Sequence, residues 1–133
     1  MIKANAEKSK HLETATIKVY GHEIDLVNLR SENYTEGSSG LGAPLEDALA
    51  RDLTFNSLFY NINEKKVEDF TGKGVDDLRD GVCRTPIQPE KTFVDDPVRV
   101  LRTIRFANRF EFTIDPELVE ATKLPSVRVS PII

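Results

Sequence analysis

Cysteine is nearly absent from this sequence: Cys83 is the single cysteine among 133 residues, and there is no tryptophan. One cysteine excludes an intrachain disulfide framework and fits a protein of a reducing compartment. No activating motif surrounds Cys83, so we expect a small buried side chain rather than a reactive thiol.

Long apolar runs are also missing. The first ten residues, MIKANAEKSK, are polar, and no run of about 18 apolar residues occurs anywhere in the chain. The sequence therefore predicts neither a secretory signal nor a transmembrane helix. We expect an intracellular protein that has no membrane partner.

The chain also lacks an excess of basic residues. Lysine and arginine total 18 against 22 aspartate and glutamate residues, which gives a net charge of −4. Proteins that coat nucleic acid without sequence preference are usually basic, so any contact with nucleic acid must be local. Hydrophobic residues make up 39% of the chain, which is enough to bury a core.

Apolar periodicity, glycines and prolines predict a chain that mixes strands and helices. TGKG at 71–74 lacks the spacing of a phosphate-binding loop, so we expect a plain turn there. The expected elements are two strands over 15–29 around a turn at Gly21-His22, a Gly- and Ser-rich loop over 33–44, a helix over 45–62, a strand over 65–70, a helix that ends at Gly81, a proline-containing hinge over 82–90, a helix over 95–110, and a helix capped by Asp115 with Pro116 in its first turn.

The helix expected over 95–110, DDPVRVLRTIRFANRF, carries arginines at a spacing of about one turn. On a helical projection Val100, Leu101, Ile104 and Ala107 gather on one face, whereas Arg102, Arg105 and Arg109 gather on the other. Arginines on one face repel each other unless an anionic or planar group lies among them. They therefore indicate either a solvated face with salt bridges or a site for phosphates and flat hydrogen-bonding edges.

Asp96 and Arg99, three residues apart, form a pair suited to reading a nucleobase. A carboxylate accepts from an exocyclic amine, and a guanidinium donates to ring nitrogens and carbonyl oxygens. Cytosine and adenine offer that pattern, whereas uracil and guanine place a carbonyl where the carboxylate needs a donor. Each unpaired polar group costs about 1–3 kcal/mol, so two mismatches disfavour the wrong base roughly a hundredfold.

Several blocks of this sequence, in this order, resemble the class II CCA-adding enzymes, the tRNA nucleotidyltransferases, and most of all their eukaryotic branch. The blocks are IDLVNLRSENYTE, PLEDALARDLTFNSLFYNIN, VEDFTGKGVDDLRDG and RTPIQPEKTFVDDPVRVLRTIRFANRF. The resemblance implies an α+β fold, in which part of a polymerase-β-like nucleotidyltransferase head is followed by the start of an all-helical neck. We expect the head over 1–82, and the hinge and first neck helices over 83–133.

The resemblance also implies roles for individual residues. Asp96 and Arg99 match the family's protein template for CTP and ATP, and Arg102 and Arg105 match arginines that contact the incoming nucleotide. The ribose-recognising Arg-Asp pair falls on Arg51 and Asp52, for which an ordinary helical ion pair is the alternative. Asp25, near the family's catalytic strands, is expected to be a supporting catalytic carboxylate.

The sequence departs from the family in ways that bear on mechanism. The family's chemistry uses Mg²⁺ held by a D-x-D pair, and no D-x-D occurs here, so we expect no metal ligands in this chain. Ala50 stands where the family usually has arginine. We expect a fragment that lacks the N-terminal catalytic motif and the C-terminal body and tail.

The partners implied are CTP, ATP and tRNA, with a separate chain as a possible source of the missing head segment. Two alternatives stay open: a noncatalytic nucleotide- or RNA-binding module, and a relative of bacterial poly(A) polymerases. The compartment (cytoplasm, nucleus or mitochondrion) and the choice among C-only, A-only and full CCA addition also stay open.

Overall fold

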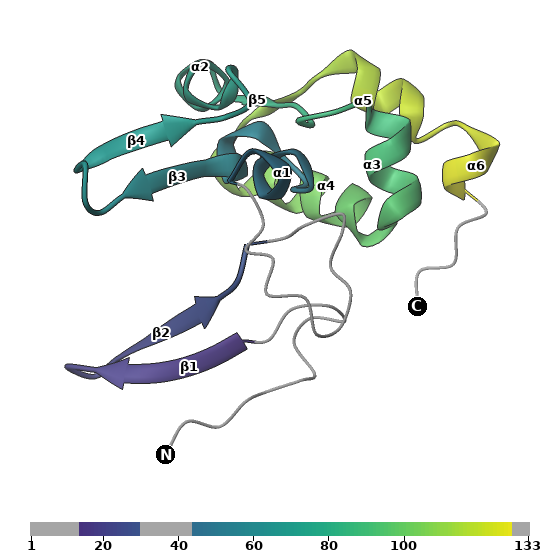
Figure 1. Cartoon of the computed structure of the whole chain (residues 1–133). Coiled ribbons are helices and arrows are strands. Elements are labelled where there is room, and N and C mark those ends of the chain that lie inside the picture. Colours follow the sequence, from purple (N-terminus) through teal and green to yellow (C-terminus); the bar gives the residue numbers. More distant parts are fainter. Residues whose placement is uncertain (1–13, 30–43, 129–133) are drawn as a thin grey trace. The chain divides into compact units, whose positions relative to one another are not determined.

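The computed structural model of the chain describes residues 14–29 and 44–128, and it divides the chain into two compact units, residues 1–47 and 48–133 (Figure 1). Among the described residues, helices accompany three two-stranded sheets, which confirms the predicted α+β class. None of the helices in that part is long and apolar enough to cross a membrane. The expected boundary at residues 82 and 83 stays a prediction.

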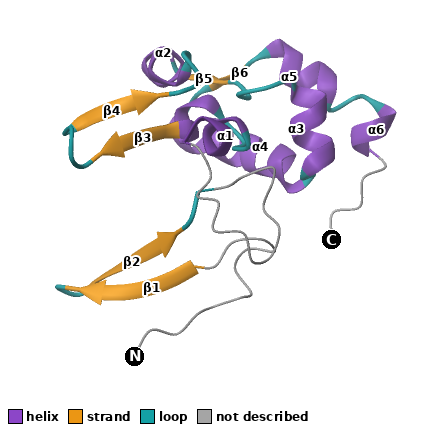
Figure 2. Cartoon of the chain, in the orientation of Figure 1, coloured by secondary structure: helices purple, strands orange, loops and turns teal. Residues whose placement is uncertain are grey.

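The first unit contains a hairpin of β1 (Thr14–Val19) and β2 (His22–Val27), which pair antiparallel (Figure 2). Tyr20 (φ 49°) and Gly21 (φ 84°) form the turn. Positive φ at both turn residues matches the right-handed twist of the strands. The predicted strands are therefore confirmed, with the turn one residue earlier than expected. Residues 33–43 of the predicted loop lie outside the described residues.

The predicted helix over 45–62 is wrong beyond its first turns. Helix α1 covers only Pro44–Leu49, a 3-10 helix, η1, covers Thr54–Ser57, and strand β3 covers Leu58–Asn61.

The physical reason lies in how the chain closes back on the end of α1. The Ser57 hydroxyl donates to the carbonyl of Ala48 at 3.0 Å and to that of Leu53 at 2.9 Å. A carbonyl nine residues earlier is thereby satisfied without a continuous helix. The aromatic residues Phe59 and Tyr60 then favour the extended backbone of β3.

Strand β4 (Lys66–Asp69) pairs antiparallel with β3, as the strand prediction over 65–70 indicated, and α2 (Gly74–Asp80) follows it. Between them the Asp69 carboxylate accepts from the backbone N–H groups of Thr71 (3.0 Å), Gly72 (3.1 Å) and Val75 (3.1 Å). Burial works to raise the pKa of Asp69, but these hydrogen bonds and that of the Thr71 hydroxyl outweigh it and lower the pKa. TGKG is a turn folded around the protein's own carboxylate.

Helix α2 ends where the sequence predicted, because Gly81 adopts a left-handed conformation (φ 69°) at its C-cap. The next two residues form β5 (Val82–Cys83), which runs parallel to β6 (Thr113–Ile114). Backbone N–H groups of Thr113 and Asp115 donate to the carbonyls of Gly81 (2.8 Å) and Cys83 (3.0 Å). Neither strand was predicted, since two residues leave no periodic pattern.

Four helices make up most of the remaining chain: α3 (Pro89–Asp95), α4 (Val98–Phe110), α5 (Pro116–Ala121) and α6 (Pro125–Arg128). The sequence did not predict α3, because Pro86 and Pro89 disfavour a continuing helix, although proline suits a first helical turn. The Asp115 cap of α5 is confirmed: its side chain accepts from the N–H of Glu117 at 2.9 Å.

The predicted helix over 95–110 is wrong at its start, since α4 begins at Val98. Asp96 has an extended backbone (φ −149°, ψ 98°) between α3 and α4. The residue before a proline is disfavoured in the helical region, and Pro97 follows.

The buried face of α4 also differs from the prediction. Ala107 is buried as expected, but Leu101 is 53% exposed and Ile104 is 54% exposed. Thr103 is buried instead, at 3% exposed, and its hydroxyl donates to the Arg99 carbonyl at 2.9 Å. The helix is rotated about its axis relative to the prediction, because Arg99 and Arg102 have partners elsewhere in the fold.

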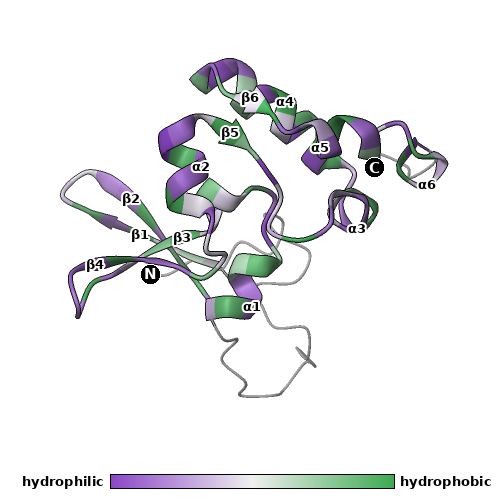
Figure 3. Ribbon diagram, turned by 90° about the horizontal axis from the view of Figure 1, so that it is seen from above, coloured by the Kyte–Doolittle hydropathy of each residue, from purple (hydrophilic) through white to green (hydrophobic). Residues whose placement is uncertain are grey.

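The core of the second unit is built around aromatic rings. Phe55 meets the rings of Phe106, Phe110 and Phe112 edge-on, at centroid distances of 6.2, 6.3 and 5.4 Å. Apolar segments such as β5 appear green in Figure 3. The buried apolar residues are Leu53, Phe55, Cys83, Phe93, Ala107, Leu118, Ala121 and Val127.

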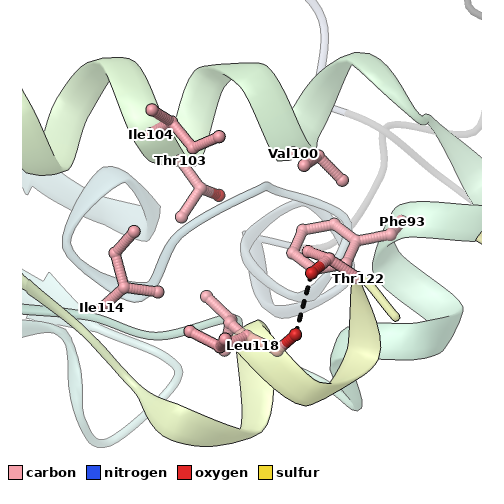
Figure 4. Close-up of a pocket in the computed structure, with 8 residues that line it drawn as sticks. Phe93, Val100, Thr103, Ile104, Ile114, Leu118 and Thr122 are labelled. Carbon is pink, nitrogen blue, oxygen red and sulfur yellow. Dashed lines mark hydrogen bonds between the residues drawn. The ribbon is translucent and has the colours of Figure 1, made fainter. Parts of the chain in front are cut away.

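A cavity of about 200 Å³ lies among α3, α4 and α5 (Figure 4). The Thr122 hydroxyl at its edge donates to the Val119 carbonyl at 2.8 Å. Val100, Thr103 and Ile104 line it from α4, on the side of the helix away from the arginines. The cavity is therefore not the predicted nucleotide site.

Cys83 provides a direct test of this core. It is fully buried, as predicted, and burial, with the nearby charges of Asp52 and Asp77, raises the pKa of its thiol to about 11. At pH 8 the native chain should react with a disulfide reagent such as DTNB about a hundredfold more slowly than the chain in guanidinium chloride. Equal rates in the two conditions would contradict the buried placement.

Candidate functional site

Asp96 sits at the junction of α3 and α4, where it caps the start of α4. Its Oδ1 accepts from the N–H of Val98 at 3.0 Å, and its Oδ2 lies 3.7 Å from Nε of Arg99. The side chain is still 47% exposed. The carboxylate is therefore fixed in direction yet open to a ligand.

Arg99 connects α4 to the turn that follows α1. Its Nη2 donates to the Ala50 carbonyl at 2.8 Å, across 49 residues of sequence, and its side chain is only 14% exposed. The contact uses the backbone of residue 50, so it does not depend on the side chain at that position. Arg99 thus lies between Asp96 and the segment that holds the predicted ribose-binding pair.

Asp52 and Arg102 form the second link between that turn and α4. Oδ2 of Asp52 lies 2.6 Å from Nε of Arg102. Oδ1 accepts from the N–H of Leu53 at 3.0 Å and from the side-chain amide of Asn56 at 3.2 Å. Asp52 is 7% exposed, whereas the Arg102 side chain is 39% exposed. A buried carboxylate therefore meets a guanidinium that reaches the surface.

Arg51 has partners of a different kind from those of Asp52. Its Nη1 donates to the Asn56 carbonyl at 3.2 Å, and its guanidinium lies 4.9 Å from the centre of the Phe59 ring. Residues 51 and 52 follow α1 and do not lie in a helix. The alternative of an ordinary helical pair is therefore wrong, because Asp52 pairs with the Arg102 guanidinium of α4.

The Phe106 ring lies under the guanidiniums of two arginines of α4, Arg102 and Arg105. The guanidinium of Arg102 lies 5.3 Å from the ring centre and that of Arg105 lies 5.0 Å from it. Both distances are typical of cation–π contacts. The ring also packs against Phe55 in the core, so one side chain serves both packing and arginine placement.

Asp25 lies on β2 in the first unit, apart from these residues in sequence. It is exposed, and its Oδ1 accepts from the Thr16 hydroxyl at 2.6 Å across the hairpin. Within residues 14–29 and 44–128, no three His, Cys, Asp or Glu side chains cluster as metal ligands would. The catalytic role of Asp25 stays a prediction.

The structure brings Arg51, Asp52, Asp96, Arg99, Arg102 and Arg105 to the turn after α1 and the adjoining side of α4. Sequence reasoning missed two contributors, the Ala50 carbonyl and the Asn56 amide. A backbone carbonyl leaves no signal in sequence, and Asn56 lay within the wrongly predicted helix.

The Asp52 carboxylate should control the stability of this site. Asp52→Ala leaves a guanidinium and two N–H donors without their acceptor, so we expect unfolding to become easier by about 2–4 kcal/mol. Asp52→Asn keeps an acceptor for Leu53 and should cost about half as much. Asp76→Ala, which removes an exposed partner of Arg79, is the matched control and should cost under about 0.5 kcal/mol. Chemical denaturation measures all three, and equal losses for Asp52→Ala and Asp76→Ala would refute the buried pair.

Comparison with known proteins places the chain in a family. Residues 1–84 match the family described as Poly A polymerase head domain. The mitochondrial CCA tRNA nucleotidyltransferase of Saccharomyces cerevisiae is 59% identical over 133 residues, which covers 97% of this chain and 24% of the yeast protein. The chain spans about a quarter of the length of the curated relatives that it matches.

Solved structures of similar fold agree with these sequence matches. A tRNA nucleotidyltransferase complexed with a primer tRNA and an incoming ATP analog matches with a TM-score of 0.71 and 28% identity, over 87% of this chain and 32% of that one. The Bacillus stearothermophilus CCA-adding enzyme in complex with CTP matches with a TM-score of 0.72 and 26% identity, over 90% of this chain and 29% of that one. The match to the family model, together with these likenesses, shows that the chain belongs to the poly(A) polymerase head-domain family.

Proposed function

We propose that this chain provides the nucleotide-selecting part of a tRNA nucleotidyltransferase that adds CCA to tRNA 3′ ends from CTP and ATP. The observation that carries the proposal is the position of Arg99, between Asp96 and the Ala50 carbonyl. This contact joins two motifs almost fifty residues apart in sequence, and we assign them to a single site. The relatives named above, which act on tRNA or bind CTP, support the same assignment.

Asp96 and Arg99 are assigned to the base. The half-exposed carboxylate of Asp96 accepts from the exocyclic amine of cytosine or adenine, and Arg99 donates to the neighbouring ring nitrogen or carbonyl. The cap on α4 and the contact with Ala50 hold the two side chains before the nucleotide arrives. Such preorganisation strengthens discrimination because little ordering is left for the ligand to drive.

Asp52 is assigned to the ribose, with Arg51 beside it, and Arg102 and Arg105 to the phosphates. A carboxylate oxygen accepts more than one hydrogen bond, so Asp52 can take a ribose hydroxyl while it keeps Arg102. Arg105 is exposed and lies on the Phe106 ring, which leaves its N–H edges available to a triphosphate.

In the proposed reaction, the 3′ hydroxyl of tRNA attacks the α-phosphate of the bound nucleotide and pyrophosphate leaves. Enzymes of this chemical class use Mg²⁺. The described residues do not form a metal site, so we assign no magnesium ligand and derive no step through the ion. The proposed contribution of this chain is to select and orient the nucleotide.

A second candidate is a poly(A) polymerase relative, which the description of the matched family favours. Such an enzyme uses ATP alone. Selective binding of CTP as well as ATP therefore distinguishes the two candidates.

Calorimetry with the four ribonucleoside triphosphates tests the proposal. We expect CTP and ATP to bind at least about tenfold more tightly than UTP and GTP, because each mismatched polar group costs about 1–3 kcal/mol. Arg99→Ala should abolish this binding. Arg79→Ala, on α2 with only exposed aspartate partners, should leave it unchanged. Equal affinity for all four nucleotides would overturn the proposal, and ATP binding without CTP binding would favour the second candidate.

Asp96→Asn tests the base reading without removing the cap on α4. The asparagine oxygen still accepts from Val98, but its amide now offers a donor to the uracil carbonyl. We expect the preference for CTP over UTP to fall about tenfold while the melting temperature stays within about 2 °C. An unchanged preference in competition binding would show that Asp96 does not read the base.

A further inference from the structure

The C-terminal half of α4 carries a second basic surface, which shares only Arg105 and its supporting ring Phe106 with the proposed nucleotide site. We call Arg109 and Phe110, with the neighbouring Arg105 and Phe106, the arginine–phenylalanine stripe. At 100° per residue these four side chains lie on the same side of the helix as Arg102. The stripe therefore continues the arginine side of α4 away from Asp52, for roughly 10 Å along the helix axis.

Stacking fixes the arrangement of the stripe. The rings of Phe106 and Phe110 are parallel within 4°, with centroids 5.9 Å apart. Arg105 lies 5.0 Å from the centre of the first ring, and Arg109 lies 5.7 Å from the centre of the second. Phe110 is nevertheless 45% exposed, and both arginines are exposed. A planar group can therefore reach an aromatic ring that is flanked by guanidiniums.

The charge of the stripe is not balanced within the described part of the chain. Arg99 and Arg102 each have a carboxylate within 4.0 Å, whereas no described carboxylate lies that close to Arg105 or Arg109. Two neighbouring cations without a counter-charge attract an anion. The helix macrodipole favours a cation at the position of Arg109, but it does not account for Arg105 or for an exposed phenylalanine ring.

We propose that the stripe binds single-stranded RNA, with a phosphate at Arg109 and a base stacked on Phe110. Guanidiniums bind phosphate oxygens, and the face of an aromatic ring accepts any unpaired base. A duplex hides the faces of its bases, so a single strand fits this surface better. This identification of the RNA rests on the proposed function: the bound segment is the end of the RNA that is to be extended. Arg105 then lies where that end meets the incoming nucleotide.

The test is fluorescence anisotropy with a labelled eight-nucleotide single-stranded RNA, across a range of salt concentrations. We expect Arg109→Gln to weaken binding about fivefold to tenfold and to reduce the slope of log affinity against log salt by about 0.7. Arg109→Lys should restore most of the slope, because it keeps the charge. Arg79→Gln is the matched exposed-arginine control and should change neither quantity.

Parallel calorimetry with CTP separates this inference from the proposed function. We expect the affinity of Arg109→Gln for CTP to stay within about twofold of that of the unmodified chain. RNA affinity and salt slope that survive Arg109→Gln would overturn the inference, whether or not the melting temperature falls, and so would a chain that binds CTP selectively but no RNA. Loss of CTP binding alone in Arg109→Gln would assign Arg109 to the nucleotide site and would overturn the inference as well. Arg109-dependent RNA binding without CTP binding would support the stripe and contradict the proposed function.

Discussion

The ion pair between Asp52 and Arg102 is the interaction on which the candidate site depends. Asp52 is 7% exposed, and a carboxylate buried to that degree without a partner costs several kcal/mol. The turn after α1 is therefore held against α4 in the folded chain. Arg99, one turn earlier on the same helix, adds a second attachment through the Ala50 carbonyl. Two contacts from a rigid helix fix both the position and the direction of the turn.

Helix α4 meets two different requirements on its two sides. Val100, Thr103 and Ile104 line an apolar cavity with α3 and α5, and the arginines occupy the other side. Phe106 links the two, because its ring packs on the core and also carries the guanidiniums of Arg102 and Arg105. In the proposed function, this site selects a nucleotide by fixed donors and acceptors at the start of α4 and along it, rather than by a nucleic-acid template. Its precision follows from the rigidity of the helix that carries it.

Local signals predicted several elements well. Gly81 ended α2 because glycine adopts the left-handed conformation without strain. Asp115 capped α5 because its side chain accepts from a backbone N–H of the first helical turn. The segment over 45–62 was different: its apolar residues suit a helix, yet it forms α1, η1 and β3. Bonds from Ser57 to Ala48 and pairing of β3 with β4 outweighed that preference. The buried face of α4 was also misplaced: Leu101 and Ile104 are half-exposed and Thr103 is buried, because Arg99 and Arg102 contact the turn after α1 and so set the rotation of the helix.

The sequence by itself determined the mixed fold class, the arginine spacing, and the pairing of a carboxylate with a guanidinium at Asp96 and Arg99. These features depend on backbone geometry and on chemistry that a few neighbouring residues contain. Only the tertiary structure decided that Arg102 pairs with Asp52, 50 residues away, and that Arg99 holds a carbonyl of the turn between them. Contacts of this kind depend on where the chain returns in space. That return is set by the balance of burial and hydrogen bonding over the whole fold, which no short stretch of sequence contains.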